Sequence, residues 1–202
     1  MKSKEEKETI AAFDFDGTIT TKDTLFEFLK FTNSPLKLIL GLLMMSPILV
    51  LHAFQIIPNY KAKQMLFSWF YRGWDLARFN EMCEEFAIRI DSVVNRNALD
   101  ELKAYNDKGV SIVIVTASIE NWVKPWATAT GINEVLGTKI EVDSNNRITG
   151  RFLSKNCYGQ EKVNRFLEMH PNRNTYKLAA YGDSRGDREL LAFADIAFLK
   201  KF

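Results

Sequence analysis

Hydrophobic and polar residues follow two different rhythms along this chain. Short apolar runs predict buried strands at 9–13, 110–115, 135–136, 177–181 and 196–199. Between most of them, apolar residues recur at helical spacing and predict helices at 98–106, 120–130, 160–169 and 187–194. A turn cluster, Asp143-Ser144-Asn145-Asn146, divides 139–152 into two alternating halves and predicts a β-hairpin. Strands that alternate with helices predict an α/β fold, with a Rossmann-like parallel sheet flanked by helices.

The region 23–95 interrupts this alternation because it contains only helical patterns. Amphipathic spacing predicts helices at 24–31, 61–72 and 76–94. The apolar stretch 36–57 is broken by Gly41 and Ser46-Pro47, and a proline removes a helical hydrogen bond, so this stretch predicts two short helices or one kinked helix. We therefore expect two units, which are a core of residues 1–22 and 96–202 and an inserted α-helical cap domain of residues 23–95.

The segment 38–60 has no formally charged residue if His52 is neutral. A straight helix of that length would cross a bilayer, but Gly41 and Pro47 weaken a spanning interpretation. The segment has basic flanks, with Lys37 on one side and Lys61 on the other. Three hypotheses follow: an apolar core of the cap, which is the leading one, a peripheral membrane or lipid contact, and an oligomer interface. The sequence does not give the oligomeric state.

Composition narrows the class of protein further. The chain has 202 residues, 47% of them hydrophobic, and a net charge of +2, which excludes a disordered chain. The charge is too even for a protein that binds nucleic acid through bulk charge, so we expect no nucleic-acid partner. Cys83 and Cys157 are too few for a disulfide framework, and we expect two reduced thiols. Residues 1–8 are a charged run without the apolar segment of a signal peptide, so we expect a cytoplasmic protein, with the inner face of a membrane as a further option.

Polar residues that could take part in a reaction follow several of the predicted strands. Each of them alone would fit a turn or a helix cap. Because ligands bind outside the carboxyl ends of parallel strands, we expect these side chains to share one crevice. Several carboxylates in one crevice repel each other unless a cation lies between them, and oxygen ligands without His or Cys favour Mg²⁺. The residues are Asp14, Asp16, Thr116, Asp183 and Asp187, with Lys162 at the start of a predicted helix.

In order and approximate spacing, these segments resemble the four motifs of the haloacid dehalogenase superfamily. The resemblance covers nearly the whole chain, and the insertion between the first and second motifs looks like the helical cap of the phosphoserine-phosphatase-like subfamily IB. The segments Thr149-Gly150-Arg151 and 156–162 are similar to general hydrolases of that subfamily. The four motif segments are Asp14-Phe15-Asp16-Gly17-Thr18, the strand end at Thr116, the helix start at Lys162, and Gly182-Asp183-Ser184-Arg185-Gly186-Asp187.

The resemblance implies a Mg²⁺-dependent phosphomonoester hydrolase that acts through an aspartyl-phosphate. In that family pattern Asp14 is the nucleophile and Asp16 the general acid and base. Mg²⁺ is held by Asp14, by Asp183 and by the backbone carbonyl of Asp16. Thr116 and Lys162 bind the phosphoryl group, Thr116 with help from N–H groups at the following helix start. Outside these contacts lie Ser184 and Asp187, the latter reaching the metal through water or fixing Lys162.

Two of these assignments have competitors in the sequence. Ser118 also follows the strand at 110–115, but Thr116 is the first hydroxyl after the apolar run. Lys155 could replace Lys162, but Lys162 has the glycine context that leads into a helix.

The substrate is less well defined than the chemistry. In phosphoserine phosphatases a glutamate shortly after the first motif reads the substrate amine, and Asp23 occupies the corresponding region here, so we expect Asp23 to select the substrate. No arginine matches the one that would read a carboxylate. The pattern of 38–60 resembles that of bacterial phosphatidylglycerophosphate phosphatases. The expected partner is a phosphorylated small molecule or a lipid head group, and the alternatives are a phosphoserine phosphatase, a lipid phosphatase at the membrane surface, or a catalytically silent phosphate-binding protein.

Overall fold

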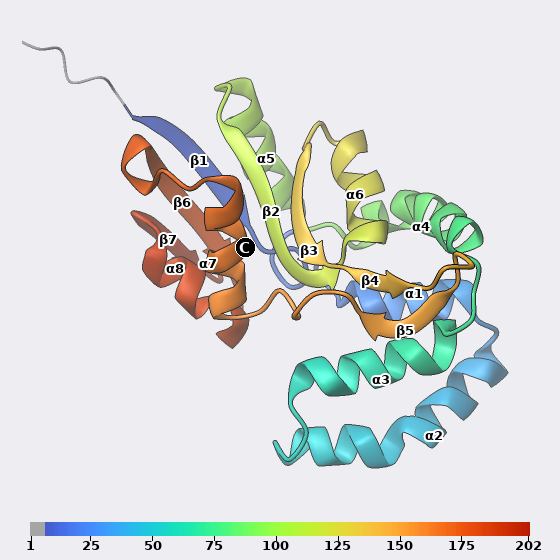
Figure 1. Cartoon of the computed structure of the whole chain (residues 1–202). Coiled ribbons are helices and arrows are strands. Elements are labelled where there is room, and N and C mark those ends of the chain that lie inside the picture. The colour runs from blue at the N-terminus through green and yellow to red at the C-terminus, as the bar shows by residue number, and fades with distance from the viewer. Residues whose placement is uncertain (1–6) are drawn as a thin grey trace, which may run out of the picture.

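The computed structural model describes residues 7–202, and its centre is a five-stranded parallel sheet in the order β3-β2-β1-β6-β7 (Figure 1). The charged run predicted at 1–8 lies mostly outside the described residues. The parallel sheet and the α/β fold class are confirmed. The strands are β1 (Glu8–Phe13), β2 (Ser111–Ile119), β3 (Glu134–Thr138), β6 (Tyr176–Gly182) and β7 (Ile196–Leu199).

The register of the central strands sets the position of the chemistry. Phe13, the last residue of β1, pairs with Ile114 of β2 and with Tyr181 of β6. The chain therefore leaves all three strands at one edge of the sheet, where Asp14 and Asp183 follow directly.

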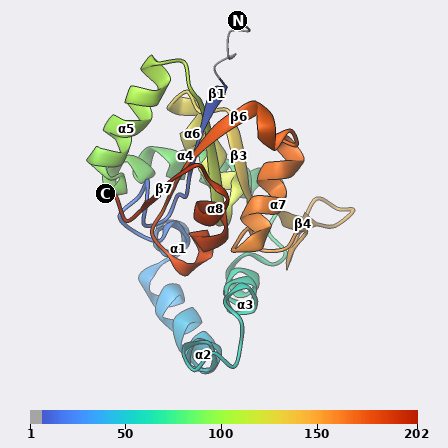
Figure 2. The same ribbon diagram turned by 90° about the vertical axis from the view of Figure 1, so that its left-hand side faces the viewer.

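Helices cover both faces of this sheet because successive β1 side chains point to opposite sides. Ala11 and Phe13 share a buried cluster with Trp122 and Trp126, whereas Ala12 belongs to a second cluster on the other face. The first face carries α5 (Arg96–Asp107) and α6 (Glu120–Ala129), and the second carries α7 (Gln160–Met169) and α8 (Arg188–Phe193) (Figure 2). Short 3-10 turns lie at Asp91–Val93, Arg173–Thr175 and Arg185–Asp187.

The insertion after β1 contributes four helices, and the predicted hairpin packs against one of them. Helices α1 (Thr24–Thr32) and α4 (Leu76–Ile90) lie close to the sheet domain, where α4 contacts α6. Helix α2 (Pro35–Ala53) and helix α3 (Asn59–Tyr71) form a helical hairpin that extends away from the sheet (Figure 1). Strands β4 (Ile140–Val142) and β5 (Ile148–Phe152) form the antiparallel hairpin, and β5 contacts α3. The division of the chain at 23 and 95 stays a prediction.

Helix α2 is a single helix with a bend, so the kinked alternative is the one that the structure contains. Pro47 lies inside it and has no N–H to donate to the carbonyl oxygen of Leu43. The hydroxyl of Ser46 donates to that oxygen instead, at 2.7 Å. Both views show that the helix changes direction along its length (Figures 1 and 2).

The leading hypothesis for segment 38–60, an apolar core of the cap, is wrong for most of its side chains. Within helix α2, all of which the structure describes, only Gly41 is buried. A Cβ on Gly41 would lie 2.4 Å from the Phe70 ring and 2.5 Å from the Trp69 ring, so α2 and α3 approach closely there. The opposite face of α2 has no partner among the described residues. By length and composition this helix could span a membrane.

Candidate active site

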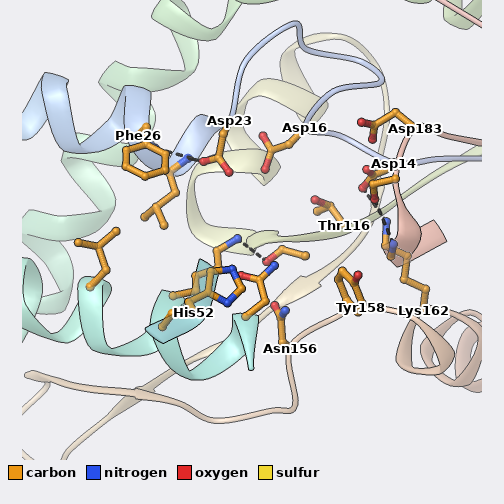
Figure 3. A pocket seen from close by; sticks show the side chains of 18 of the residues that line it. Asp14, Asp16, Asp23, Phe26, His52, Thr116, Asn156, Tyr158, Lys162 and Asp183 are labelled. Carbon is orange, nitrogen blue, oxygen red and sulfur yellow. Dashed lines mark hydrogen bonds and ion pairs between the residues drawn. The ribbon is translucent and has the colours of Figure 1, made fainter. Parts of the chain in front are cut away.

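A cavity of about 390 Å³ opens at the carboxyl edge of the sheet, between the strand ends and the α2–α3 hairpin. It brings together seven of the eight site residues predicted from the sequence, most of which Figure 3 labels. The eighth, Asp187, is buried and does not line the cavity. The seven that line the cavity are Asp14, Asp16, Asp23, Thr116, Lys162, Asp183 and Ser184.

Lys162 lies at the floor of the cavity between two carboxylates. Its Nζ is 2.6 Å from Oδ1 of Asp14 and 2.5 Å from Oδ1 of Asp187, and the residue is only 2% exposed. The first turn of α7 places it there, and Gly159, with a φ of +60°, precedes that helix. Lys155, its competitor in the sequence, is exposed and does not line this cavity.

Asp187 holds the loop that follows β6. Its Oδ2 accepts hydrogen bonds from the backbone N–H of Asp183, from the backbone N–H of Ser184 and from the Ser184 hydroxyl, at 3.2, 3.0 and 2.8 Å. Its other oxygen binds Lys162. Asp187 therefore fixes both the lysine and the loop that carries Asp183.

The residues present fit a divalent cation. Ligand oxygens of Asp14, Asp183 and Asp187 lie within 4.8 Å of one another. Oδ1 of Asp183 is buried and accepts no hydrogen bond from any described residue. A Cβ on Gly17 would lie 2.5 Å from Oδ2 of Asp183, so only glycine, here with a φ of +81°, allows the β1 loop to approach this carboxylate. Clustered carboxylate oxygens, one of them unpartnered, are a donor set for a hard cation such as Mg²⁺.

Burial dominates the electrostatics of this floor. Loss of water raises the pKa of Asp14 to about 7, although Lys162 acts in the opposite direction. Burial also raises the pKa of Asp183, and the nearby Asp187 carboxylate adds to this. Burial alone would lower the pKa of Lys162, but attraction to Asp14 and Asp187 raises it above its usual range. The lysine is therefore charged, and a bound cation would favour the ionised form of Asp14.

The carboxylate of Asp16 lies apart from this cluster and has its own partners. Its Oδ1 accepts from the backbone N–H and the hydroxyl of Thr24, at 2.9 and 2.7 Å, and its Oδ2 accepts from the Ser118 hydroxyl. The indole N–H of Trp122 donates to the Thr24 hydroxyl at 3.1 Å. Ser118 thus contacts Asp16, and the sequence analysis missed this role and also missed Thr24 and Trp122. The predicted metal contact of Asp16 through its backbone carbonyl stays a prediction.

Thr116 is almost fully buried at the floor of the cavity. Its Oγ1 accepts the backbone N–H of Ser118 at 3.0 Å, which leaves the hydroxyl hydrogen free to donate into the cavity. The predicted end of the strand at 115 is wrong, because β2 continues to Ile119 after a register shift that follows Val115. Helix α6 begins at Glu120, as predicted, four residues after Thr116. The help expected from N–H groups at this helix start stays a prediction.

The outer wall of the cavity contains residues that the sequence did not single out. Asp23 lies in this wall, where its Oδ1 accepts from two backbone N–H groups and caps α1. Its expected role in substrate selection stays a prediction. Burial raises the pKa of Asp23, and the nearby Asp16 carboxylate adds to this. Lys63 of α3 also lines the wall, where its Nζ donates to the carbonyl of Ala117 at 3.0 Å. His52 of α2 lines it as well, and it was visible in the sequence as the one ionisable residue of its apolar segment.

Comparison with known proteins agrees with this arrangement of motifs. Residues 11–192 match the haloacid dehalogenase-like hydrolase family over most of the chain. The chain belongs to this family. It is 34% identical over 187 residues to protein CicA of Caulobacter vibrioides, a match that covers 92% of this chain and 83% of CicA. A probable phosphatase of Mycobacterium tuberculosis is 30% identical over 125 residues, which is 59% of this chain and 42% of that protein.

Several solved structures have the same fold at low sequence identity. A protein of unknown function from Bordetella pertussis superimposes with a TM-score of 0.78 at 19% identity, over 94% of this chain and 88% of that one. A phosphoserine phosphatase with an analogue of its phospho-aspartyl intermediate gives a TM-score of 0.65 at 16% identity, over 96% of this chain and 87% of that one. The family is thus confirmed, the fold is shared with a phosphoserine phosphatase, and the substrate is a separate question.

Proposed function

We propose that this hydrolase cleaves phosphate monoesters through a covalent aspartyl-phosphate on Asp14. One observation carries the proposal: two carboxylates of the same motif have separate environments. Asp14 lies against Lys162 and the acidic cluster, whereas Asp16 lies against hydroxyl groups. Two carboxylates that differ in environment can perform two different chemical tasks.

Asp14 acts as the nucleophile and Asp16 as the proton carrier. A carboxylate oxygen of Asp14 attacks phosphorus while Asp16 donates its proton to the departing ester oxygen, so the alcohol leaves neutral. Asp16 then takes a proton from a water molecule that attacks the same phosphorus. The bond between phosphorus and the Asp14 oxygen breaks, and phosphate and free Asp14 are released. This path divides a very slow hydrolysis into two easier steps.

The remaining residues hold the phosphoryl group in place. Thr116 donates its hydroxyl hydrogen to one phosphoryl oxygen, and Lys162 balances the negative charge that gathers on the others. Asp14, Asp183 and the backbone carbonyl of Asp16 would hold Mg²⁺, which neutralises charge on the phosphoryl oxygens when it is bound. Ser184 and Asp187 keep Asp183 and Lys162 in position through the hydrogen bonds described above.

The substrate selectivity that we propose resides in the outer wall of the cavity. Lys63 and His52 are among its polar groups, and Leu25, Phe26 and Leu49 make it partly apolar. This mixture suits a leaving group that carries both apolar surface and a negative charge. It supports a phosphatidylglycerophosphate-type lipid phosphate more than phosphoserine, because no arginine lines the described cavity and Asp23 already caps α1.

The test uses Asp14→Asn and p-nitrophenyl phosphate. Wild-type protein should hydrolyse it with Mg²⁺ and lose activity with EDTA, while Asp14→Asn should have no detectable turnover. Acid-quenched wild-type protein should carry phosphate on the peptide that contains Asp14. The matched control is Asp107→Asn, which removes an exposed carboxylate at the end of α5 and should keep full activity. Normal turnover by Asp14→Asn would refute the nucleophile.

A panel of phosphate esters tests the substrate and the silent alternative together. Phosphoserine, short-chain phosphatidic acid and short-chain phosphatidylglycerophosphate should be compared at equal concentration, and we expect the lipid esters to give the higher kcat/KM. A preference for phosphoserine would contradict this choice. If the protein hydrolysed none of the esters but still bound inorganic phosphate, the result would favour a catalytically silent phosphate-binding protein.

A further inference from the structure

The positive charge of this protein is concentrated in one part of the chain. Between Phe28 and Trp74 the sequence contains no Asp or Glu, but it contains five basic residues. The other residues then hold twenty-two basic and twenty-five acidic side chains, a net charge of −3. Three of the five lie on the α2–α3 hairpin and Arg72 directly follows it, whereas Lys30 lies on α1 beside Glu27. The hairpin is therefore a cationic projection on an otherwise slightly acidic protein. The five residues are Lys30, Lys37, Lys61, Lys63 and Arg72.

The outer face of α2 is apolar as well as exposed. Its residues recur at helical spacing, so they form a stripe along the side that faces away from α3. The stripe continues into the turn after the helix, where Phe54 is 75% exposed. Contiguous apolar surface of this extent marks a binding surface rather than ordinary solvent-facing protein. We call this surface the outer stripe, and its members are Leu36, Ile39, Leu40, Leu43, Met44, Val50, Leu51, Phe54 and Ile56.

The outer stripe lies next to the cavity. Leu49 and His52 come from the inner face of α2 and line the cavity wall, while α3 contributes Lys63 to the same wall. Figure 1 shows α2 as the element farthest from the sheet, with α3 between them. Whatever covers the outer stripe is therefore separated from the cavity only by the thickness of the hairpin.

We propose that the outer stripe docks on an anionic lipid bilayer, with α2 lying in the plane of the membrane interface. The apolar stripe would enter the boundary between head groups and acyl chains, and the exposed Lys37 and Lys61 of the hairpin would contact anionic head groups. This charge complementarity decides the occupant, because no acidic residue of the hairpin opposes such a surface.

A transmembrane arrangement of α2 conflicts with the packing of the hairpin. Helix α3 returns directly alongside α2 and contacts β5 at the sheet domain. His52, near the end of α2, lines the cavity, and Gly41, in its first half, packs against Phe70. Helix α2 is therefore held against the protein at both places. A spanning α2 would carry His52 to the far side of the bilayer and would separate Gly41 from Phe70.

A second copy of this chain is a weaker occupant for an electrostatic reason. A two-fold contact through the outer stripe would bring two hairpins together that carry only basic charges. Lys37 and Lys61, which are exposed, would then face like charges across the contact. An anionic bilayer removes that repulsion and also covers the apolar side chains.

The test measures flotation of the full chain with vesicles. Vesicles of phosphatidylcholine alone should bind little protein, whereas vesicles of phosphatidylcholine and phosphatidylglycerol in equal parts should bind it strongly and release part of it at high salt. The double variant Leu40→Glu with Leu43→Glu should weaken partitioning roughly a hundredfold, because it removes two apolar contacts and adds two repelled charges. The matched control is Ile88→Glu, which changes an exposed apolar residue of α4 that is 77% exposed, and should bind like the wild type.

The charge contribution is tested separately from the apolar one. Lys37→Gln with Lys61→Gln should weaken binding about fivefold per lysine on the anionic vesicles and leave binding to neutral vesicles unchanged. Neither the leucine pair (Leu40 and Leu43) nor the lysine pair (Lys37 and Lys61) lines the cavity. Turnover of p-nitrophenyl phosphate in solution should therefore stay at the wild-type level in all these variants. The vesicle result is therefore independent of the proposed hydrolysis.

Two outcomes would overturn the docking proposal. One is equal flotation of the wild type and of Leu40→Glu with Leu43→Glu. The other is a stable dimer without lipid, seen by analytical ultracentrifugation, that the same double variant converts to a monomer, because it would assign the outer stripe to a second copy.

Discussion

The floor of the cavity and the outer stripe of α2 are built on opposite principles. At the floor, charged groups are buried and most of them have partners: Lys162 is 2% exposed and binds two carboxylates. Along the outer stripe, apolar side chains are exposed and have no partner among the described residues, with Leu43 63% exposed. Each arrangement is costly for an isolated protein, because burial penalises charge and water penalises apolar surface.

The two regions differ in where their interaction partners lie. The charged groups of the floor pair with one another within the chain, so a change to one of them leaves another unpaired. The side chains of the outer stripe make no contacts with other described residues of the protein that a substitution would remove. Substitutions there should therefore leave folding and turnover in solution intact. Floor substitutions should therefore change turnover and stability together, whereas outer substitutions should change only binding to a surface.

After loss of the nucleophile itself, the largest expected effect comes from Lys162→Gln. Asp14 and Asp187 would lose their common cation and repel each other, which should lower the free energy of unfolding by about 3–5 kcal/mol. Loss of the positive charge beside the phosphoryl group should lower kcat by about a thousandfold. Urea unfolding and p-nitrophenyl phosphate turnover measure both effects. Lys155→Gln is the control, and if it lost as much activity, the choice between the two lysines would be wrong.

A smaller effect is expected from Ser118→Ala. Asp16 would lose one of its hydrogen bonds and its carboxyl would be less well oriented, which should lower kcat/KM by about a hundredfold. Because a proton donor matters most for poor leaving groups, the loss should be larger for an alkyl phosphate than for p-nitrophenyl phosphate.

A general loss of structure would reduce kcat/KM for both esters equally. The ratio of the two kcat/KM values therefore identifies a positioning role for Ser118. Ser144→Ala, in the exposed turn of the β4–β5 hairpin, is the control and should leave both rates unchanged. An equal loss for the two esters would remove the link between Ser118 and Asp16.

The sequence was sufficient for the floor because the signal there combines two local features. Three of the apolar runs that predict buried strands, at 9–13, 110–115 and 177–181, end within two residues of a carboxylate or hydroxyl of the site, and parallel strands bring such ends to one edge. The structure accordingly places Asp14, Thr116 and Asp183 around one cavity. The sequence offers Ser118 only as a competitor of Thr116, because its contact with Asp16 spans 102 positions of the chain and depends on where Thr24 begins its helix.

The environment of the outer stripe could not be predicted from hydropathy. An apolar segment has the same hydropathy pattern whether it packs inside a protein, enters a membrane or contacts another chain, because composition does not identify the partner. The structure resolves part of this: Gly41 fixes α2 against α3 and turns the opposite face outward. The end of β2 was missed for a related reason, since the strand continues past polar residues through pairing with Thr138 of β3.

Cation affinity at the floor should depend on pH. The pKa of Asp14 is raised to about 7, so below that pH a cation must displace a proton from this carboxyl. Affinity for Mg²⁺ should therefore fall about tenfold for each unit of pH below the pKa of Asp14 and level off above it. Isothermal titration calorimetry on wild type and Asp14→Asn measures this. Asp14→Asn should bind more weakly and lose the steep pH dependence, and an unchanged slope would assign the proton to another group.

The smallest effect on turnover is expected from Gly41→Ala, which tests whether the hairpin is independent of the floor. Alanine favours a helix by about 1 kcal/mol over glycine, but its Cβ would meet the buried Phe70 ring and the half-exposed Trp69 ring. Overpacking of this kind costs about 1–3 kcal/mol, so the hairpin should loosen. Hydrogen exchange along α2 should accelerate, and Trp69→Ala in the same background should restore part of the protection. Solution turnover should stay unchanged, because Gly41, Trp69 and Phe70 do not line the cavity; a parallel loss of turnover would mean that the two regions are coupled through α3.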